Sequence, residues 1–100
     1  MKTILMTGLA AAALAALPAL ASPGIIEAEC HAQLNMPAGA CACLGRTAGE
    51  ELNDDEMALV VAMVTKDEPA AAELRGRMPI DQLTKAGMFM TTAPARCAGQ

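Results

Sequence analysis

Apolar positions between residues 22 and 100 recur every three or four residues, which is the spacing of amphipathic helices. The first such stretch places Ile26, Cys30 and Leu34 four residues apart, with charged and polar residues between them. The spacing predicts a helix that turns this face inward and ends at Asn35. Alanine, leucine, methionine and glutamate dominate this part of the chain, which favours helices throughout.

Prolines divide this part of the chain into pieces of helical length. Pro37 can begin a second helix, because the fixed backbone of proline suits the first helical position. That helix would carry Cys41 and Cys43, and we expect Gly45 and Gly49 to weaken it. The first two helices are therefore predicted to form a hairpin.

The strongest helix signal is the stretch "LNDDEMALVVAMVTKDEP", residues 52–69. Asn53 is a good N-cap residue, and Glu56 stands where its side chain can return to the cap. Asp54 and Asp55 lie at the positive end of the helix dipole. The pattern predicts a helix over residues 54–66.

Apolar residues surround this third helix almost completely. Leu59 and Met63 lie nearly opposite the main apolar stripe, which consists of Met57, Val60, Val61 and Val64. Two interpretations remain open: the helix is the central element and is covered by the others, or one of its faces is free for a partner. The pattern favours the first.

Two more helices are expected towards the C-terminus. Asp67 can cap one that ends around Arg77. A second stripe then follows at positions 80, 83, 87 and 90. We expect this last helix to continue through Gly87 and to be broken by Pro94.

The first 21 residues have the organisation of a secretory signal peptide. Lys2 precedes an apolar run that ends at Pro18, and small residues then stand before a predicted cleavage site between Ala21 and Ser22. Removal of residues 1–21 would leave one small helical domain, residues 22–100, without a stable membrane insertion. We therefore expect an exported protein, either periplasmic or extracellular.

Four cysteines follow the predicted signal peptide, namely Cys30, Cys41, Cys43 and Cys97. An even number of cysteines in an exported chain predicts two disulfides. A hairpin that turns near Met36 and Pro37 favours Cys30–Cys43 with Cys41–Cys97. The pairing Cys30–Cys41 with Cys43–Cys97 remains open, because a small change in the position of the turn reverses the choice. In both, the second helix is linked to two different neighbours.

Charge and composition exclude several classes of function. The signal peptide contains Lys2, so the remaining chain has six basic residues against 11 acidic ones, and Phe89 is its single aromatic residue. A nucleic-acid-binding surface needs positive charge and stacking side chains, so we expect no nucleic-acid partner. No nucleophile with a base and an orienting group can be recognised either. We predict a non-enzymatic protein without a cofactor.

A metal site is the alternative prediction. Cys30, His31, Cys41 and Cys43, together with nearby methionines, supply soft ligands that suit copper or zinc. The methionines are not clustered in a repeated motif, and thiolate ligands must stay reduced in a compartment that favours oxidation. The pattern therefore favours disulfides, with an envelope copper- or zinc-binding protein as the second hypothesis.

These patterns together predict an all-α fold, a small disulfide-stapled helical bundle made of a helical hairpin, a central helix and C-terminal helices. The excess of apolar residues on the central helix suggests a binding role. We expect the protein to bind a protein partner or an apolar ligand in the cell envelope, or a second copy of itself. The expected binding residues are Leu59, Met63, Met88 and Phe89.

Overall fold

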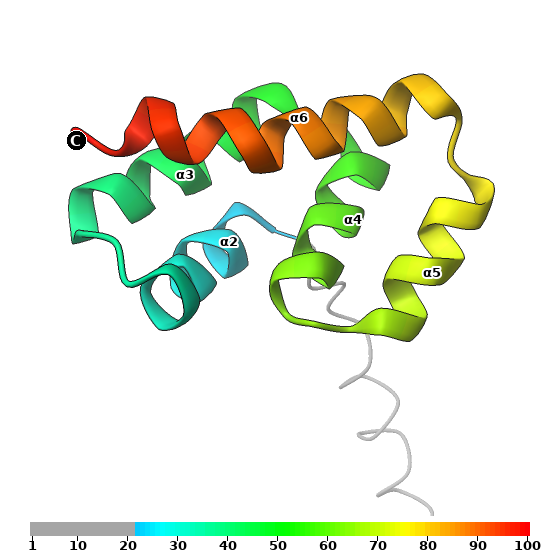
Figure 1. Cartoon of the computed structure of the whole chain (residues 1–100), viewed down its shortest axis with the longest axis horizontal. Helices are drawn as coiled ribbons and strands as arrows, with labels where there is room; N and C mark the ends of the chain where they lie inside the picture. Colours follow the sequence, from blue (N-terminus) through cyan, green and yellow to red (C-terminus); the bar gives the residue numbers. More distant parts are fainter. Residues whose placement is uncertain (1–21) are drawn as a thin grey trace, which may run out of the picture.

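The computed structural model describes residues 22–100, and the predicted signal peptide lies outside the described residues. The fold is all-helical, as predicted, and no strand occurs in residues 22–100 (Figure 1). The elements in chain order are α2 (Pro23–Glu29), a π-helical segment η2 (Cys30–Leu34), α3 (Ala38–Glu51), α4 (Asp54–Val64), α5 (Glu68–Arg77) and α6 (Ile80–Cys97).

The hairpin of α2 and α3 is close-packed because two glycines of α3 face α2. A Cβ at Gly45 would lie 3.0 Å from the carbonyl oxygen of Pro23, and one at Gly49 would lie 3.4 Å from Pro23 Cγ. The expectation that Gly45 and Gly49 weaken this helix is wrong, since α3 is continuous through both of them. The contact with α2 offsets the low helix propensity of glycine.

The chain between α2 and the hairpin loop forms a π-helical turn, which the sequence pattern did not predict. Ile26 and Cys30 are buried as expected, but Leu34, at the end of η2, is 51% exposed. A π-turn contains an extra residue, so it rotates the following side chains away from the face set by a regular helix. Asn35 then ends the segment in the left-handed conformation, with φ of 54°.

Helix α4 is the central element, and the interpretation that other helices cover it is confirmed. It contacts α2, α5 and α6 (Figure 1), and both of its apolar faces contribute to the core. Its N-terminus has the predicted capping box. The Glu56 amide donates to Asn53 Oδ1, and the Asn53 amide donates to Glu56 Oε1, both at 2.8 Å. The helix ends at Val64, two residues earlier than expected.

Helices α5 and α6 complete the bundle. Asp67 caps α5 as predicted, because its Oδ1 accepts from the Ala70 amide at 3.2 Å. Helix α6 runs across α3 and α4 (Figure 1) and continues through Gly87, as expected. It also continues through Pro94, so the expectation that this proline ends the helix is wrong. Cys97, one turn further on, is bonded to α3 and holds this end of α6 in place.

The disulfides are Cys30–Cys41 and Cys43–Cys97. The pairing that the expected hairpin favoured is wrong, and the second of the two pairings is the one observed. The reason is the position of the turn: the chain reverses from Asn35, so Cys30 and Cys41 each lie about one helical turn from the loop. As expected, the second helix of the hairpin is linked to two different neighbours. Two disulfides indicate that the chain folds in an oxidising compartment.

Candidate functional site: an apolar pocket between the hairpin, α4 and α6

A pocket of about 440 Å³ opens between η2, α4 and α6. This volume lies within the range of small-molecule sites, which is roughly 300–1,000 Å³. Its lining is largely apolar and comes from several separate segments of the chain. The lining residues are Ile26, Glu29, Cys30, Gln33, Leu34, Met36, Leu44, Val60, Met63, Val64, Lys66, Phe89, Met90 and Pro94.

The inner wall of the pocket consists of core side chains. Four helices each contribute one buried side chain to this wall: Ile26 from α2, Leu44 from α3, Val60 from α4 and Phe89 from α6. They lie on the inward stripes of their helices, which the helical period places on one side. The pocket is therefore an extension of the core towards the surface.

The outer wall is more accessible and contains flexible side chains. Met36, Met63 and Met90 are half-buried, and Leu34 is exposed at the edge. Methionine is unbranched and polarisable, so it adapts its shape to what lies against it. The π-turn has a direct effect here, because it places Leu34 at the edge of the pocket rather than in the core.

Three polar side chains lie among the lining residues: Glu29, Gln33 and Lys66. Gln33 Nε2 donates to Glu29 Oε1 at 2.9 Å and to the Val64 carbonyl at 3.1 Å. The second bond connects η2 to the end of α4, and both of its residues line the pocket. Lys66 is exposed and forms no ion pair within residues 22–100.

Lys66 has an unusual backbone conformation, which follows from how α4 ends. Its φ is 59°, in the left-handed region. The Lys66 amide donates to the Met63 carbonyl at 3.2 Å, and the Asp67 amide donates to the Ala62 carbonyl at 2.8 Å. These two bonds form a Schellman motif, in which glycine is the usual residue at the position of Lys66. A side chain in this conformation costs about 1 kcal/mol.

The structure separates the four residues expected to form one binding surface. Leu59 and Phe89 are only 2% and 4% exposed, so neither can serve as a surface residue. Leu59 lies on α4, which is covered on both of its apolar faces, and Phe89 is one of the buried residues of α6. Met63 and Phe89 line the pocket. Met88 is 56% exposed and lies outside the lining. The predicted surface is thus replaced by a pocket that retains Met63 and the buried ring of Phe89.

Sequence reasoning missed most of the lining, including Met36, Val64, Met90 and Pro94. Met36 lies in the hairpin loop, and Pro94 appeared to be a helix breaker, so neither carried a binding signal. Val64 and Met90 were assigned to the core stripes of their helices. Only the arrangement of the helices in space brings these side chains to one opening.

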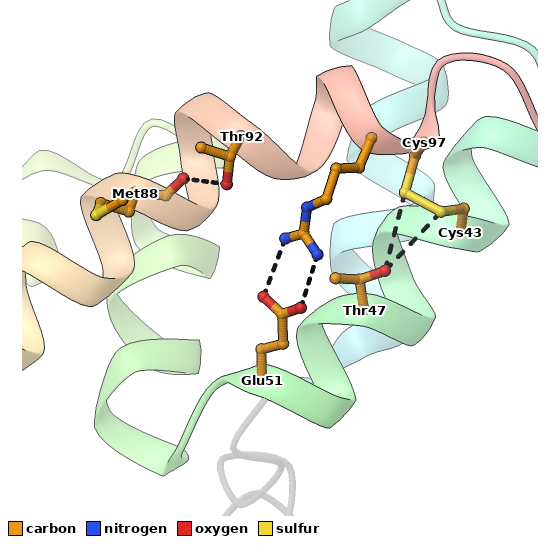
Figure 2. Close-up of polar contacts among 7 residues, drawn as sticks. Cys43, Thr47, Glu51, Met88, Thr92 and Cys97 are labelled. Atoms are coloured by element: carbon orange, nitrogen blue, oxygen red, sulfur yellow. Dashed lines mark hydrogen bonds and ion pairs between the residues drawn. A yellow bond between two sulfur atoms is a disulfide. The ribbon is translucent and has the colours of Figure 1, made fainter.

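A second cluster of side chains fastens α3 to α6, and Figure 2 shows it. Thr47 Oγ1 lies 3.8 Å from each sulfur of the Cys43–Cys97 disulfide. One turn further along α3, the two carboxylate oxygens of Glu51 accept from Arg96 Nη1 and Nη2 at 2.9 and 3.1 Å. The bond from Arg96 holds the pKa of the Glu51 carboxyl below its ordinary value. This cluster is a connection between helices.

The thiolate ligands on which the alternative metal-site prediction depends are not available in the structure. Cys30, Cys41 and Cys43 are all in disulfides and therefore offer no thiolate. Within residues 22–100, no three His, Cys, Asp or Glu side chains gather in a way that could hold a metal ion. In the same residues, no helix is both long and apolar enough to cross a membrane.

Comparison of the chain with protein-family models, curated proteins and solved structures finds no match.

Proposed function

We propose that this protein binds a small apolar molecule in the pocket between the hairpin, α4 and α6, as a non-enzymatic binding protein of the periplasm or the extracellular space. The observation that carries the proposal is the pocket itself, which has the size of a small-molecule site and a lining that is largely apolar. Burial of an apolar ligand there is favoured at about 25 cal/mol per Å² of apolar surface removed from water.

The covalent connections around the pocket support a binding role. Cys30, which lines the pocket, is bonded to α3, and the C-terminal end of α6 is bonded to the same helix. The hairpin side and the α6 side of the pocket are therefore fixed to α3 before a ligand arrives. A pocket formed in advance binds more tightly, because less ordering accompanies association.

The polar groups of the lining favour binding over catalysis. Within residues 22–100, no serine, threonine or histidine lines the pocket, and Gln33 and Glu29 are hydrogen-bonded to each other. Acid–base or nucleophilic catalysis requires a reactive group with a neighbouring base in reach of the substrate. Three polar groups around an apolar interior are the usual composition of a binding site.

Two methionine substitutions test the proposal. Met63→Gln introduces an amide into the pocket lining, whereas Met88→Gln makes the same change at an exposed site outside the lining. We expect a neutral naphthylamine fluorophore to bind the oxidised protein and its Met88→Gln variant equally. The Met63→Gln variant should bind it about tenfold more weakly, since a polar group is buried against the ligand.

Circular dichroism and thermal denaturation control for folding of both variants. Equal affinities in the two variants, or no binding to the unmodified protein, would contradict the proposal.

A further inference from the structure

We propose that the pocket takes a single-chain amphiphile with a carboxylate head group, and that Lys66 is the residue that recognises the head. This inference rests on the proposed function and deepens it. It is carried by two observations that are independent of each other. One is the backbone of Lys66, and the other is the distribution of charge around the pocket.

The backbone argument begins with the end of α4. Lys66 occupies the position of a Schellman motif where a glycine would avoid the steric cost of the left-handed conformation. Its side chain makes no hydrogen bond or ion pair within residues 22–100 that would offset this cost. Strained positions of this kind are concentrated at functional sites. A glycine at this position would avoid the strain but would leave the pocket lining without the lysine side chain.

The charge argument concerns the three polar lining residues. Among the lining residues of the described part of the chain, Lys66 is the only cationic one and Glu29 is the only anionic one. The carboxylate of Glu29 accepts from Gln33, whereas the ammonium of Lys66 has no ion-pair partner in the described part of the chain. Glu29 also has no ion-pair partner within residues 22–100, but one of its carboxylate oxygens is occupied by Gln33, so the charged side chain of the lining without a hydrogen bond is Lys66. An anionic group of the ligand would complement it.

An acyl chain with a terminal carboxylate satisfies both parts of the site. The chain would lie against the apolar inner wall, which contains Val60 and Phe89. The carboxylate would stay near solvent and accept hydrogen bonds from Lys66 Nζ. A cationic head group would be repelled by the Lys66 ammonium, and Glu29, the carboxylate in the lining, already accepts a hydrogen bond from Gln33.

Three ligands with the same chain and different heads test the inference: dodecanoate, dodecanol and dodecyltrimethylammonium. Each is titrated calorimetrically into the oxidised protein below its micelle concentration. We expect dodecanoate to bind about two- to fivefold more tightly than dodecanol, as suits a partly exposed ion pair. The trimethylammonium compound should bind more weakly than dodecanol.

Substitutions at Lys66 identify the source of this preference. Lys66→Gly removes the charge and the strain together, so it should raise the Tm and abolish the preference for dodecanoate over dodecanol. Lys66→Arg should retain the preference. Arg46→Gln removes a cationic charge on α3 at an exposed residue that lies outside the pocket lining and has no ion pair within residues 22–100, and it should change neither. The increase in Tm excludes misfolding as the cause of any lost affinity.

The outcomes separate this inference from the proposed function. If dodecanol binds but dodecanoate has no advantage, or if Lys66→Gly keeps the advantage, the role of Lys66 is refuted while the apolar pocket stands. If none of the three compounds binds, both proposals are refuted.

Discussion

Gly45 and Gly87 show that the same residue can have opposite effects at two helical positions. Both lie inside helices, but Gly45 is buried against α2, whereas a Cβ at Gly87 would meet no heavy atom within 4 Å. At Gly87 only the intrinsic preference matters, and alanine is favoured over glycine. At Gly45 a Cβ would press on the backbone of α2, which cannot move aside as a flexible side chain could.

We therefore predict opposite changes in stability for two identical substitutions. Gly45→Ala should lower the free energy of unfolding by about 1–3 kcal/mol, because it overpacks the contact between α2 and α3. Gly87→Ala should raise it by up to about 1 kcal/mol. Urea denaturation of both variants measures the difference. Stabilisation by Gly45→Ala would show that the close approach of α2 to α3 is wrong.

The ion pair between Glu51 and Arg96 is the other feature that acts at the level of single residues. Both side chains are at the surface, and the bidentate geometry connects the last turn of α3 to the last turn of α6. The hydrogen bond from Arg96 lowers the pKa of Glu51. A group whose pKa is lower in the folded protein stabilises it above the unfolded pKa, and this contribution disappears as the pH falls through the folded value.

We predict that Glu51→Gln lowers the Tm slightly near pH 7 and that the difference from the unmodified protein disappears in acid. Glu50→Gln is the matched control, because Glu50 shares the same helix end but has no ion-pair partner within residues 22–100. The change in Tm of Glu50→Gln therefore measures the effect of removing a carboxylate from the negative end of the helix dipole, without the loss of an ion pair. Thermal denaturation between about pH 7 and about pH 2 measures both variants. A deficit of Glu51→Gln that persists in acid would contradict this interpretation of the pair.

At the scale of whole elements, α6 is notable because it continues through a proline. Pro94 has no amide proton, so the Met90 carbonyl loses its usual partner, and proline inside a helix costs about 3 kcal/mol. The Cys43–Cys97 disulfide fixes the turn that follows. The covalent bond and the ion pair from Arg96 hold the last turn of α6 against α3, although its hydrogen bonding is interrupted.

Removal of each disulfide should therefore have a different effect. Loss of Cys43–Cys97 opens a loop of 54 residues and should cost about 4 kcal/mol by the chain-entropy relation, against about 3 kcal/mol for Cys30–Cys41, which spans 11. Paired cysteine-to-alanine variants and hydrogen exchange provide the measurement. Amides 95–97 should lose protection selectively when Cys43–Cys97 is removed. Equal protection of these amides in both variants would contradict the fastening role of this bond.

The elements were largely predictable from the sequence, whereas several of their details were not. The capping box at Asn53 and the cap at Asp67 are local signals, because the groups that interact are three residues apart. The disulfide pairing depends on where the chain turns, and a π-turn and a left-handed Asn35 moved that turn. Lys66 in a glycine position gave no sequence signal, because its conformation is set by how α4 ends.

At the scale of the molecule, α3 is the helix to which both disulfides connect, and the pocket lies between the segments that are held to it. One disulfide connects α3 to its hairpin partner and the other connects it to α6, while α4 contacts both α2 and α6 as the central helix (Figure 1). The lining draws on segments that are distant in sequence, so periodicity within any one helix could not reveal it. Leu59 and Met88 were expected at a binding surface only because each is apolar on its own helix.

The distribution of methionines allows the most direct test of the pocket. Met36, Met63 and Met90 line it, whereas Met57, Met78 and Met88 do not. Titration of dodecanol into the oxidised protein, followed by NMR of the methionine methyl groups, reports on both sets at once. We predict that the methyl resonances of the three lining methionines shift while those of the other three stay unchanged. Shifts confined to Met57, Met78 or Met88, or no shift at all, would contradict the proposal that this pocket binds apolar molecules.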